Sequence, residues 1–134
     1  HFSANWLHHQ LSQRKRMIKP LLMDQRFIAG LGNIYVDEAL WKAKVHPKTL
    51  SSNVGKTHCN KLYIAIQNIL NRAIKYKGTT IIDFGYGNNE KGSFKKELKV
   101  FGRTNESCLR CSMPIVKIFV DQRGAYFCKK CQRV

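Results

Sequence analysis

The apolar residues at the start of the chain recur at the spacing of amphipathic helices. Residues 3–24 read as helical, and one face of this stretch carries Trp6, Leu7 and Leu11. A second helical stretch is predicted around residues 18–27, and Pro20 fits its first turn because a helix makes no use of the N–H there. The chain therefore begins with helical structure.

A further helix is predicted over residues 34–44. Asn33 is a suitable N-cap for it, because its side-chain oxygen can accept a hydrogen bond from a free backbone N–H. Asp37 and Glu38 lie early in this helix, where carboxylates complement the positive helix end. Pro47 prevents the helix from continuing.

The clearest helical pattern spans residues 57–77. Its apolar positions repeat every three or four residues, at Leu62, Ile66, Ile69, Leu70 and Ala73. Lys75 and Lys77 lie in the expected last turn, where cations are favourable, and Gly78 is a suitable C-cap. We therefore predict a helical bundle for the first part of the chain.

The pattern changes at residues 83–96, where glycine and asparagine are frequent, and we place a domain boundary there. After it, residues 98–134 look like short strands around turns, with residues 115–120 as the clearest strand. The predicted fold is mostly α, with a helical bundle over residues 1–88. Residues 89–134 form a loop followed by a small β-hairpin module.

The charge of the chain indicates a polyanionic partner. Lys and Arg total 24 against 8 Asp and Glu, which gives a net charge of +16, distributed as +9 on residues 1–88 and +7 on residues 89–134. Nucleic acid is the usual partner of such a chain, and an anionic membrane surface is the rival. The sequence has no apolar run near the roughly 18 residues that span a bilayer and no signal-peptide pattern at its start, so we expect no membrane partner. Solubility alone needs much less charge, although a ribosomal or chromatin protein would look similar.

Four of the five cysteines form two pairs with metal-ligand spacing, Cys108-x2-Cys111-x16-Cys128-x2-Cys131. Four thiolates suit tetrahedral Zn²⁺ and leave no open position, so we predict one structural zinc and no catalytic metal. An iron centre of the same geometry and free thiols are the alternatives. The odd count of cysteines argues against disulfides and for a reducing compartment. Cys59 is predicted to be a small core residue of its helix.

A glycine turn, Gly30-Leu31-Gly32-Asn33, opens the helix predicted over residues 34–44. Such a turn lets a phosphate approach free backbone N–H groups, although many glycine turns serve packing only. The flanking sequence is more specific, and it includes Ile18-Lys19-Pro20-Leu21-Leu22-Met23-Asp24-Gln25, Asp37-Glu38-Ala39-Leu40 and His46-Pro47. Together these segments resemble the helix-two-turn-helix segment of the formamidopyrimidine-DNA glycosylase and endonuclease VIII family of base-excision repair.

The resemblance continues to the end of the chain. Its further motifs are Gly78-Thr79-Thr80, Asp83-Phe84, Glu97-Leu98-Lys99-Val100-Phe101-Gly102-Arg103, the four cysteines with Tyr126-Phe127-Cys128, and Cys131-Gln132. The formamidopyrimidine branch is the closest, because the loop between Asp83 and Glu97 is long enough to be that branch's lesion-capping loop. The resemblance implies a helix-two-turn-helix domain followed by a zinc finger.

The resemblance also implies roles for single residues. Lys19 and Asn33 match family residues that grip phosphates near the lesion, and Gly32 belongs to the turn that a phosphate approaches. Arg123, in a predicted turn Gln122-Arg123-Gly124, matches the zinc-finger arginine that enters the DNA at the extruded nucleotide. From the residues alone, three of them have a plainer interpretation: Lys19 as a surface lysine, Asn33 as a helix cap and Arg123 as a turn residue.

One departure from the family bears on activity. The family's nucleophile is an N-terminal proline followed by glutamate, on a separate β-sandwich domain, whereas this sequence starts at His1. We therefore expect no catalytic residue in this chain and no activity of the chain alone, with a catalytic domain either upstream or missing.

The function implied by the resemblance is the DNA-binding half of a DNA glycosylase and abasic-site lyase. Such an enzyme acts on oxidised purines such as formamidopyrimidine and 8-oxoguanine, and it extrudes the damaged base from double-stranded DNA. The alternative is a stand-alone, non-catalytic, zinc-containing module that binds nucleic acid. In either case we expect an intracellular location, in the cytoplasm or nucleoid.

Overall fold

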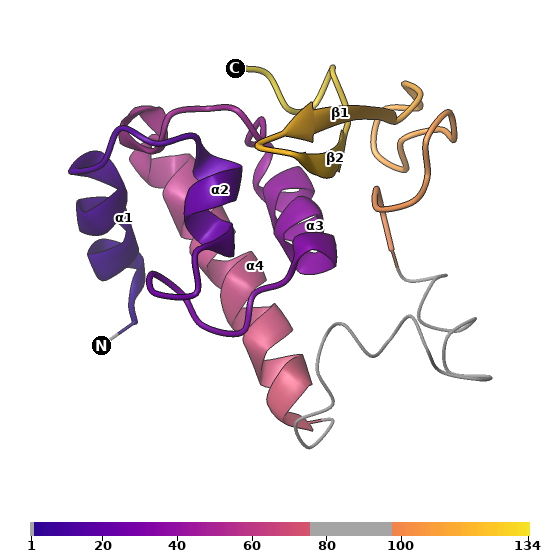
Figure 1. Ribbon diagram of the computed structural model, residues 1–134. Helices are drawn as coiled ribbons and strands as arrows, with labels where there is room; N and C mark the ends of the chain where they lie inside the picture. The colour runs from indigo at the N-terminus through magenta and orange to yellow at the C-terminus, as the bar shows by residue number, and fades with distance from the viewer. Residues whose placement is uncertain (1, 76–97) are drawn as a thin grey trace.

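The computed structural model describes residues 2–75 and 98–134, and within them it contains four α-helices and one antiparallel hairpin. The elements are α1 (Ala4–Ser12), α2 (Ile18–Met23), α3 (Asn33–Ala43), the short 3-10 helix η1 (Ser51–Asn53), α4 (Lys56–Lys75), β1 (Val116–Val120) and β2 (Arg123–Phe127). Helices α1 and α3 pack against α4, and β2 packs against α3 (Figure 1). The mostly α fold with a β-hairpin that the sequence predicted is confirmed.

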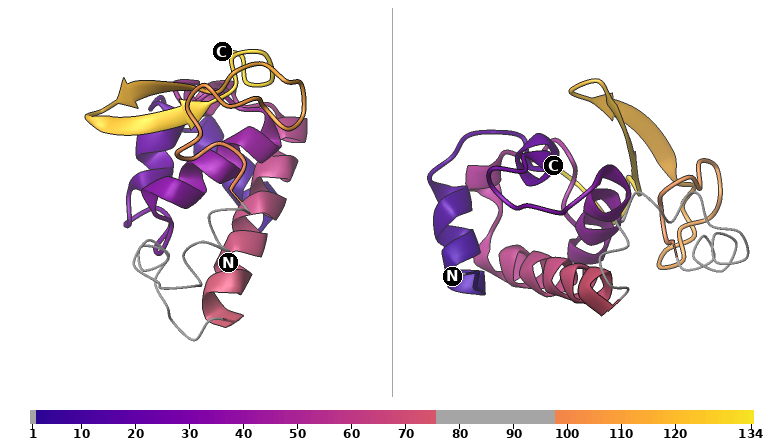
Figure 2. Two further views of the ribbon diagram at one scale, coloured as in Figure 1. Left: turned by 90° about the vertical axis from the view of Figure 1, so that its right-hand side faces the viewer. Right: turned by 60° about the horizontal axis from the view of Figure 1, so that its bottom comes forward.

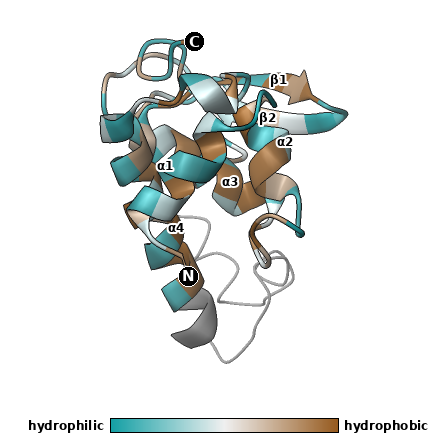
Figure 3. Ribbon diagram, turned by 90° about the vertical axis from the view of Figure 1, so that its left-hand side faces the viewer, coloured by the Kyte–Doolittle hydropathy of each residue, from teal (hydrophilic) through white to brown (hydrophobic). Residues whose placement is uncertain are grey.

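The helices share one apolar core. Its fully buried members include Leu7 and Leu11 of α1, Leu40 of α3, and Leu62 and Ile66 of α4. Figure 3 shows these apolar stretches turned toward the inside of the helical part, with polar residues on the outer faces. Burial of a leucine or isoleucine side chain stabilises a fold by about 1.5–3 kcal/mol, so this cluster is the main apolar contribution to the stability of the helical part.

Residues 3–24 do not form one continuous helix, because the link between α1 and α2 pairs with a distant segment. The N–H of Ile18 donates to the carbonyl of Thr49 at 2.7 Å, and the N–H of Ser51 donates to the carbonyl of Arg16 at 2.7 Å. These bonds hold the end of the link, at Met17, in a short antiparallel bridge with Leu50. The helical spacing of the apolar residues gave no sign of them.

Helix α2 ends earlier than the predicted residue Phe27 because Asp24 begins a turn. The Oδ1 atom of Asp24 accepts a hydrogen bond from the N–H of Arg26 at 2.9 Å. The turn closes at Gly30, whose φ of +90° is a left-handed value that glycine adopts without strain. The N–H of Gly30 donates to Oε1 of Gln25 at 2.8 Å, which fixes the approach to α3.

Helix α3 begins at Asn33, so the prediction that Asn33 caps it is wrong. The N-cap is Gly32, and it makes no side-chain capping bond. The first turn holds no acidic residue, because Asp37 and Glu38 lie farther along α3, where both are buried. The predicted interaction of these carboxylates with the helix dipole is therefore also wrong. Asp37 accepts hydrogen bonds from Lys19 and Tyr126, and Glu38 accepts them from residues 99–101.

The helix predicted over residues 57–77 is α4, and its predicted apolar positions Leu62, Ile66 and Ile69 are buried. Several predicted features lie outside the described residues. They are Lys77, the C-cap Gly78, the motifs between Gly78 and Glu97, and the loop with the predicted domain boundary. In the part that the structure describes, no helix is both long and apolar enough to cross a membrane.

The finger segment, as we call residues 98–134, lies over α3, with its hairpin on the side away from α1 (Figure 2). The strands pair in register from Val116 opposite Phe127 to Val120 opposite Arg123. The turn between them has two residues, Asp121 and Gln122, with φ values of 50° and 69°. Two positive φ values are characteristic of the two-residue turns that join twisted strands. Arg123 is therefore the first residue of β2, and the predicted turn at residues 122–124 is one residue too late.

Candidate metal centre and nucleic-acid interface

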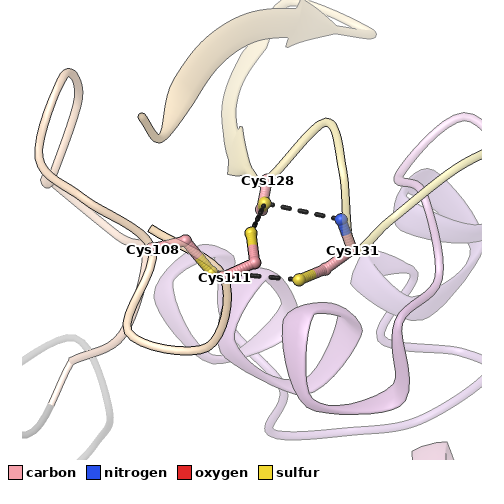
Figure 4. A group of neighbouring side chains, drawn as sticks. All are labelled: Cys108, Cys111, Cys128 and Cys131. Carbon is pink, nitrogen blue, oxygen red and sulfur yellow. Dashed lines mark hydrogen bonds between the residues drawn. The ribbon is translucent and has the colours of Figure 1, made fainter. Parts of the chain in front are cut away.

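Four cysteine thiols converge where the finger segment meets α3 (Figure 4). Cys108 and Cys111 come from the turn before β1, and Cys128 and Cys131 come from the turn after β2. All four Sγ atoms lie within 4.8 Å of one another, with 3.4 Å between those of Cys111 and Cys128 and 3.9 Å between those of Cys108 and Cys131. Sulfurs placed tetrahedrally around zinc at about 2.3 Å lie about 3.8 Å apart, so the set fits one zinc ion.

The four cysteines are the site of one structural zinc, as the spacing predicted. They supply all four ligands of a tetrahedral ion and leave no position for a substrate. The fifth cysteine, Cys59, is fully buried in the core of the helices, as predicted, and burial raises the pKa of its thiol to about 11. Cys59 is therefore a protonated core residue and not a ligand.

Two residues that the sequence did not single out donate hydrogen bonds to the sulfurs. Nε1 of Trp41, on α3, donates to Sγ of Cys108 at 3.4 Å, and Nε of Arg110 donates to Sγ of Cys131 at 3.2 Å. The Arg110 guanidinium also lies over the Trp41 ring, 3.9 Å from its centroid. Donors of this kind favour the thiolate form that a metal requires. Through them the metal centre is attached to α3.

Two buried polar side chains also join the finger segment to the helices. The Glu38 carboxylate accepts three backbone N–H bonds at 2.7–2.9 Å, from Lys99, Val100 and Phe101. Gln132 donates from Nε2 to the carbonyl of Val45 and accepts at Oε1 from the N–H of Cys128, both at 2.9 Å. Backbone N–H groups that are shielded from water need hydrogen-bond acceptors. The Glu38 carboxylate supplies the acceptors that a neighbouring strand would otherwise provide to residues 99–101.

Asp37, the neighbour of Glu38, holds the returning strand of the hairpin. Its Oδ2 accepts the N–H of Tyr126 at 3.0 Å, and its Oδ1 accepts a hydrogen bond from Nζ of Lys19 at 2.7 Å. Lys19 also donates to the carbonyl of Gly124 at 2.7 Å. Both side chains of this ion pair are only 1% exposed.

Burial disfavours the charged forms of both Asp37 and Lys19. Desolvation raises the pKa of Asp37 to about 6, against the opposite pull of the Lys19 ammonium and of the Tyr126 N–H. Desolvation also lowers the pKa of Lys19, and the Asp37 carboxylate opposes that shift. Each ion is therefore kept in place by its partner and by the backbone bonds on either side.

The residues predicted to contact DNA gather around the start of β2. Lys19 and Asn33 both donate to the Gly124 carbonyl, at 2.7 Å and 3.4 Å, and Arg123 is the exposed residue just before it. Gly32, the N-cap of α3, precedes Asn33. The structure thus brings the four residues together, with Lys19 buried and Arg123 exposed.

A hollow of about 200 Å³ opens between α2 and the tip of the hairpin. Its lining includes three cationic residues, Arg16, Lys19 and Arg123, and two acidic ones, Asp24 and Asp121. Nζ of Lys19 is already occupied by Asp37 and Gly124, so Arg16 and Arg123 are the cations of this hollow that solvent reaches. Arg16 is also paired with Asp24, at 3.1 Å, so Arg123 is the cation of this hollow best placed to meet an anion such as a phosphate.

Comparison with known proteins decides what kind of molecule this is. Residues 1–84 match the sequence profile described as "Formamidopyrimidine-DNA glycosylase H2TH domain", and residues 105–134 match that described as "Zinc finger found in FPG and IleRS". The chain belongs to the formamidopyrimidine-DNA glycosylase family. The family resemblance seen in the sequence is thereby confirmed, and the helix-two-turn-helix segment corresponds to the helical part of the fold.

Relatives in the formamidopyrimidine-DNA glycosylase family align along nearly the whole chain. The enzyme of Halalkalibacterium halodurans is 44% identical over 132 residues, which cover 98% of this chain and 48% of the relative. That of Pelotomaculum thermopropionicum is 42% identical over 133 residues, covering 99% of this chain and 48% of the relative. The chain therefore spans about half the length of the curated relatives it matches.

Solved structures of the formamidopyrimidine-DNA glycosylase family share the fold. MutM in complex with DNA that contains carbocyclic 8-oxo-G has a TM-score of 0.84 and 38% identity, over 99% of this chain and 47% of that chain. The Lactococcus lactis enzyme in complex with FAPY-dG-containing DNA has a TM-score of 0.83 and 39% identity, over 99% and 48% of the two chains. Both of these relatives are bound to damaged DNA.

Proposed function

We propose that this chain is the DNA-binding half of a base-excision-repair glycosylase and abasic-site lyase that acts on oxidised purines, including formamidopyrimidine and 8-oxoguanine. The observation that carries this proposal is the convergence of Lys19, Asn33 and Arg123 at the start of β2, in a chain of this family. The damaged DNA in the solved relatives supports the same assignment. We infer a site of action inside the cell, in the cytoplasm or nucleoid, where the substrate is found.

In this proposal the chain holds the damaged duplex and the family's N-terminal half supplies the chemistry. Arg123 reaches the DNA from the hairpin tip, while the backbone N–H groups that follow Gly32 at the start of α3 face a phosphate. Bound zinc keeps the hairpin folded and takes no part in base release, because its four ligands leave it no open position. We assign no catalytic residue to residues 1–134.

Binding to duplex DNA is expected to depend steeply on salt. Four thiolates and one Zn²⁺ together contribute −2, which leaves about +14 of the formal charge of +16 for a polyanion. If about five phosphates are neutralised, counterion release gives a log–log slope of roughly −4 to −5. The affinity then falls by about 250- to 1,000-fold between about 50 and 200 mM salt. Fluorescence anisotropy with a labelled duplex measures the slope, and a flat response contradicts contact with phosphates.

The same assay separates damage recognition from general binding to nucleic acid. A duplex with a tetrahydrofuran abasic analogue is expected to bind more tightly than its undamaged counterpart, and Arg123→Ala is expected to reduce that preference. Arg133→Ala removes the same charge from an exposed site at the C-terminal end and serves as the matched control. Equal affinity for both duplexes would favour a stand-alone module that recognises nucleic acid without regard to damage.

A further inference from the structure

The hairpin that carries Arg123 is held on the helices by a closed set of polar contacts. Lys19 of α2 donates to the Gly124 carbonyl at 2.7 Å, and Asp37 of α3 accepts the Tyr126 N–H at 3.0 Å. The Lys19 and Asp37 side chains bond each other at 2.7 Å, which completes the set. Asn33 of α3 donates to the same carbonyl at 3.4 Å, so the ion pair, with this amide beside it, registers two helices and one strand against one another.

Stability alone does not account for this arrangement. A buried ion pair is often no more stabilising than apolar side chains of similar volume, because both ions lose their hydration. The Lys19 and Asp37 side chains are both 1% exposed, so they bear that cost in full. Unlike an apolar contact, the ion pair and its hydrogen bonds have a preferred geometry. They are satisfied at only one position of β2 relative to the helices.

Arg123 stands next to the anchored part of β2. It directly precedes Gly124, it pairs with Val120, and the two-residue turn before it leaves the hairpin tip little freedom. A displacement of the Gly124 carbonyl therefore displaces Arg123.

We propose that Lys19 and Asp37 are positioning residues whose ion pair fixes Arg123 where it contacts DNA. This inference rests on the proposed function, because Arg123 must touch DNA for its position to matter. It gives Lys19 a role that the family resemblance did not imply, in which the lysine acts through β2.

Asp37→Asn is the sharpest test, because simple electrostatics and positioning predict opposite results. Removal of a negative charge raises the affinity of a basic protein for DNA through charge alone. Positioning predicts the reverse: an affinity about ten-fold lower for the duplex with the abasic analogue, since the amide loses the ionic contact with Lys19. Glu106→Gln is the charge control, because Glu106 is an exposed acid of the finger segment. It is expected to bind at least as well as the unaltered chain.

A double-mutant cycle with Arg123→Ala separates positioning from a general loosening of the fold. If Asp37 acts through Arg123, Asp37→Asn weakens binding when Arg123 is present and adds less than about two-fold when Arg123 is already alanine. In ¹⁵N NMR spectra, Asp37→Asn should shift the amides of Tyr126, Gly124 and Arg123. The amides of Lys99 and Val100, held by Glu38, should stay in place.

Several outcomes would overturn the proposal. They are unchanged or higher affinity of Asp37→Asn, the same loss in both Arg123 backgrounds, no effect of Arg123→Ala in a chain that binds, or an unshifted Arg123 amide. Should Asp37→Asn lose its zinc, the pair Lys19→Met with Asp37→Leu removes the contact with an apolar replacement, and the same comparisons apply. If the unaltered chain does not bind the duplex at all, the proposed function fails, and the NMR shift still decides whether the ion pair places Arg123.

Discussion

Replacement of Cys111 by serine is expected to abolish zinc binding and to unfold the finger segment while the helices stay folded. Metal binding supplies about 10–16 kcal/mol to small zinc modules, and a three-thiolate site loses much of it. The second apolar cluster of the molecule depends on the ligands, since Cys108 and Cys128 belong to it beside Trp41, Val100 and Ile115. The core of the helices takes only Leu98 and Phe101 from the finger segment, so we expect it to persist. Elemental analysis gives the zinc content, and NMR reports the loss of β1 and β2.

Cys59→Ala is the matched control for this prediction. Both variants retain four cysteines, but only Cys59→Ala keeps the four that converge, since Cys59 lies in the core of the helices. We expect one zinc per chain for Cys59→Ala and none for Cys111→Ser. Full zinc content in folded Cys111→Ser protein would show that the four thiols are not the ligand set.

Lys19→Met is expected to destabilise the folded chain by about 3–5 kcal/mol near neutral pH, because it leaves the Asp37 carboxylate buried and unpaired. Urea unfolding of the zinc-loaded protein measures the change. The loss should depend on pH. Burial already raises the pKa of Asp37 to about 6, and removal of the Lys19 ammonium, which lowers that pKa, raises it further.

The sign of the pH dependence follows from this shift. A carboxyl group whose pKa is higher in the folded state than in the unfolded state favours folding at low pH, and the advantage is lost as pH rises through the folded-state value. Lys19→Met is therefore expected to be closer to the unaltered chain at about pH 5 than at about pH 8. Adding Asp37→Leu should recover most of the stability, since no buried charge remains. A deficit that is equal at both pH values would mean that Asp37 is not the group left unpaired.

The sequence was sufficient for features that are local along the chain. Each C-x2-C pair places its two thiolates on one turn, so the zinc ligands were identified from spacing alone. The amphipathic pattern of α4 likewise reports its own buried face. The core and the metal site were predictable for this reason, and the family motifs added the expected roles of Lys19, Asn33 and Arg123.

What the sequence could not give are contacts between distant segments. Asp37 and Glu38 were interpreted as complements to a helix dipole, because their partners Tyr126 and Lys99 lie 89 and 61 positions away. The end of α1 was missed for the same reason, since it depends on backbone pairing with residues 49–51. The available signal was two adjacent carboxylates in an otherwise apolar stretch of helix, which indicates buried acids with specific partners.

The position of α3 between the two cores has a consequence for how the chain matures on the ribosome. Synthesis delivers α1 to α4 before the finger segment, and domains generally fold in the order in which they emerge. At that moment Asp37, Glu38 and Trp41 face water, and their partners at residues 99–126 have not yet emerged. The helices then present the side chains of Asp37, Glu38 and Trp41 to solvent as the docking surface for the finger segment. We therefore expect the finger segment to dock on the helices last, so that Asp37, Glu38 and Trp41 lose their contact with water only when Tyr126, residues 99–101 and Cys108 arrive.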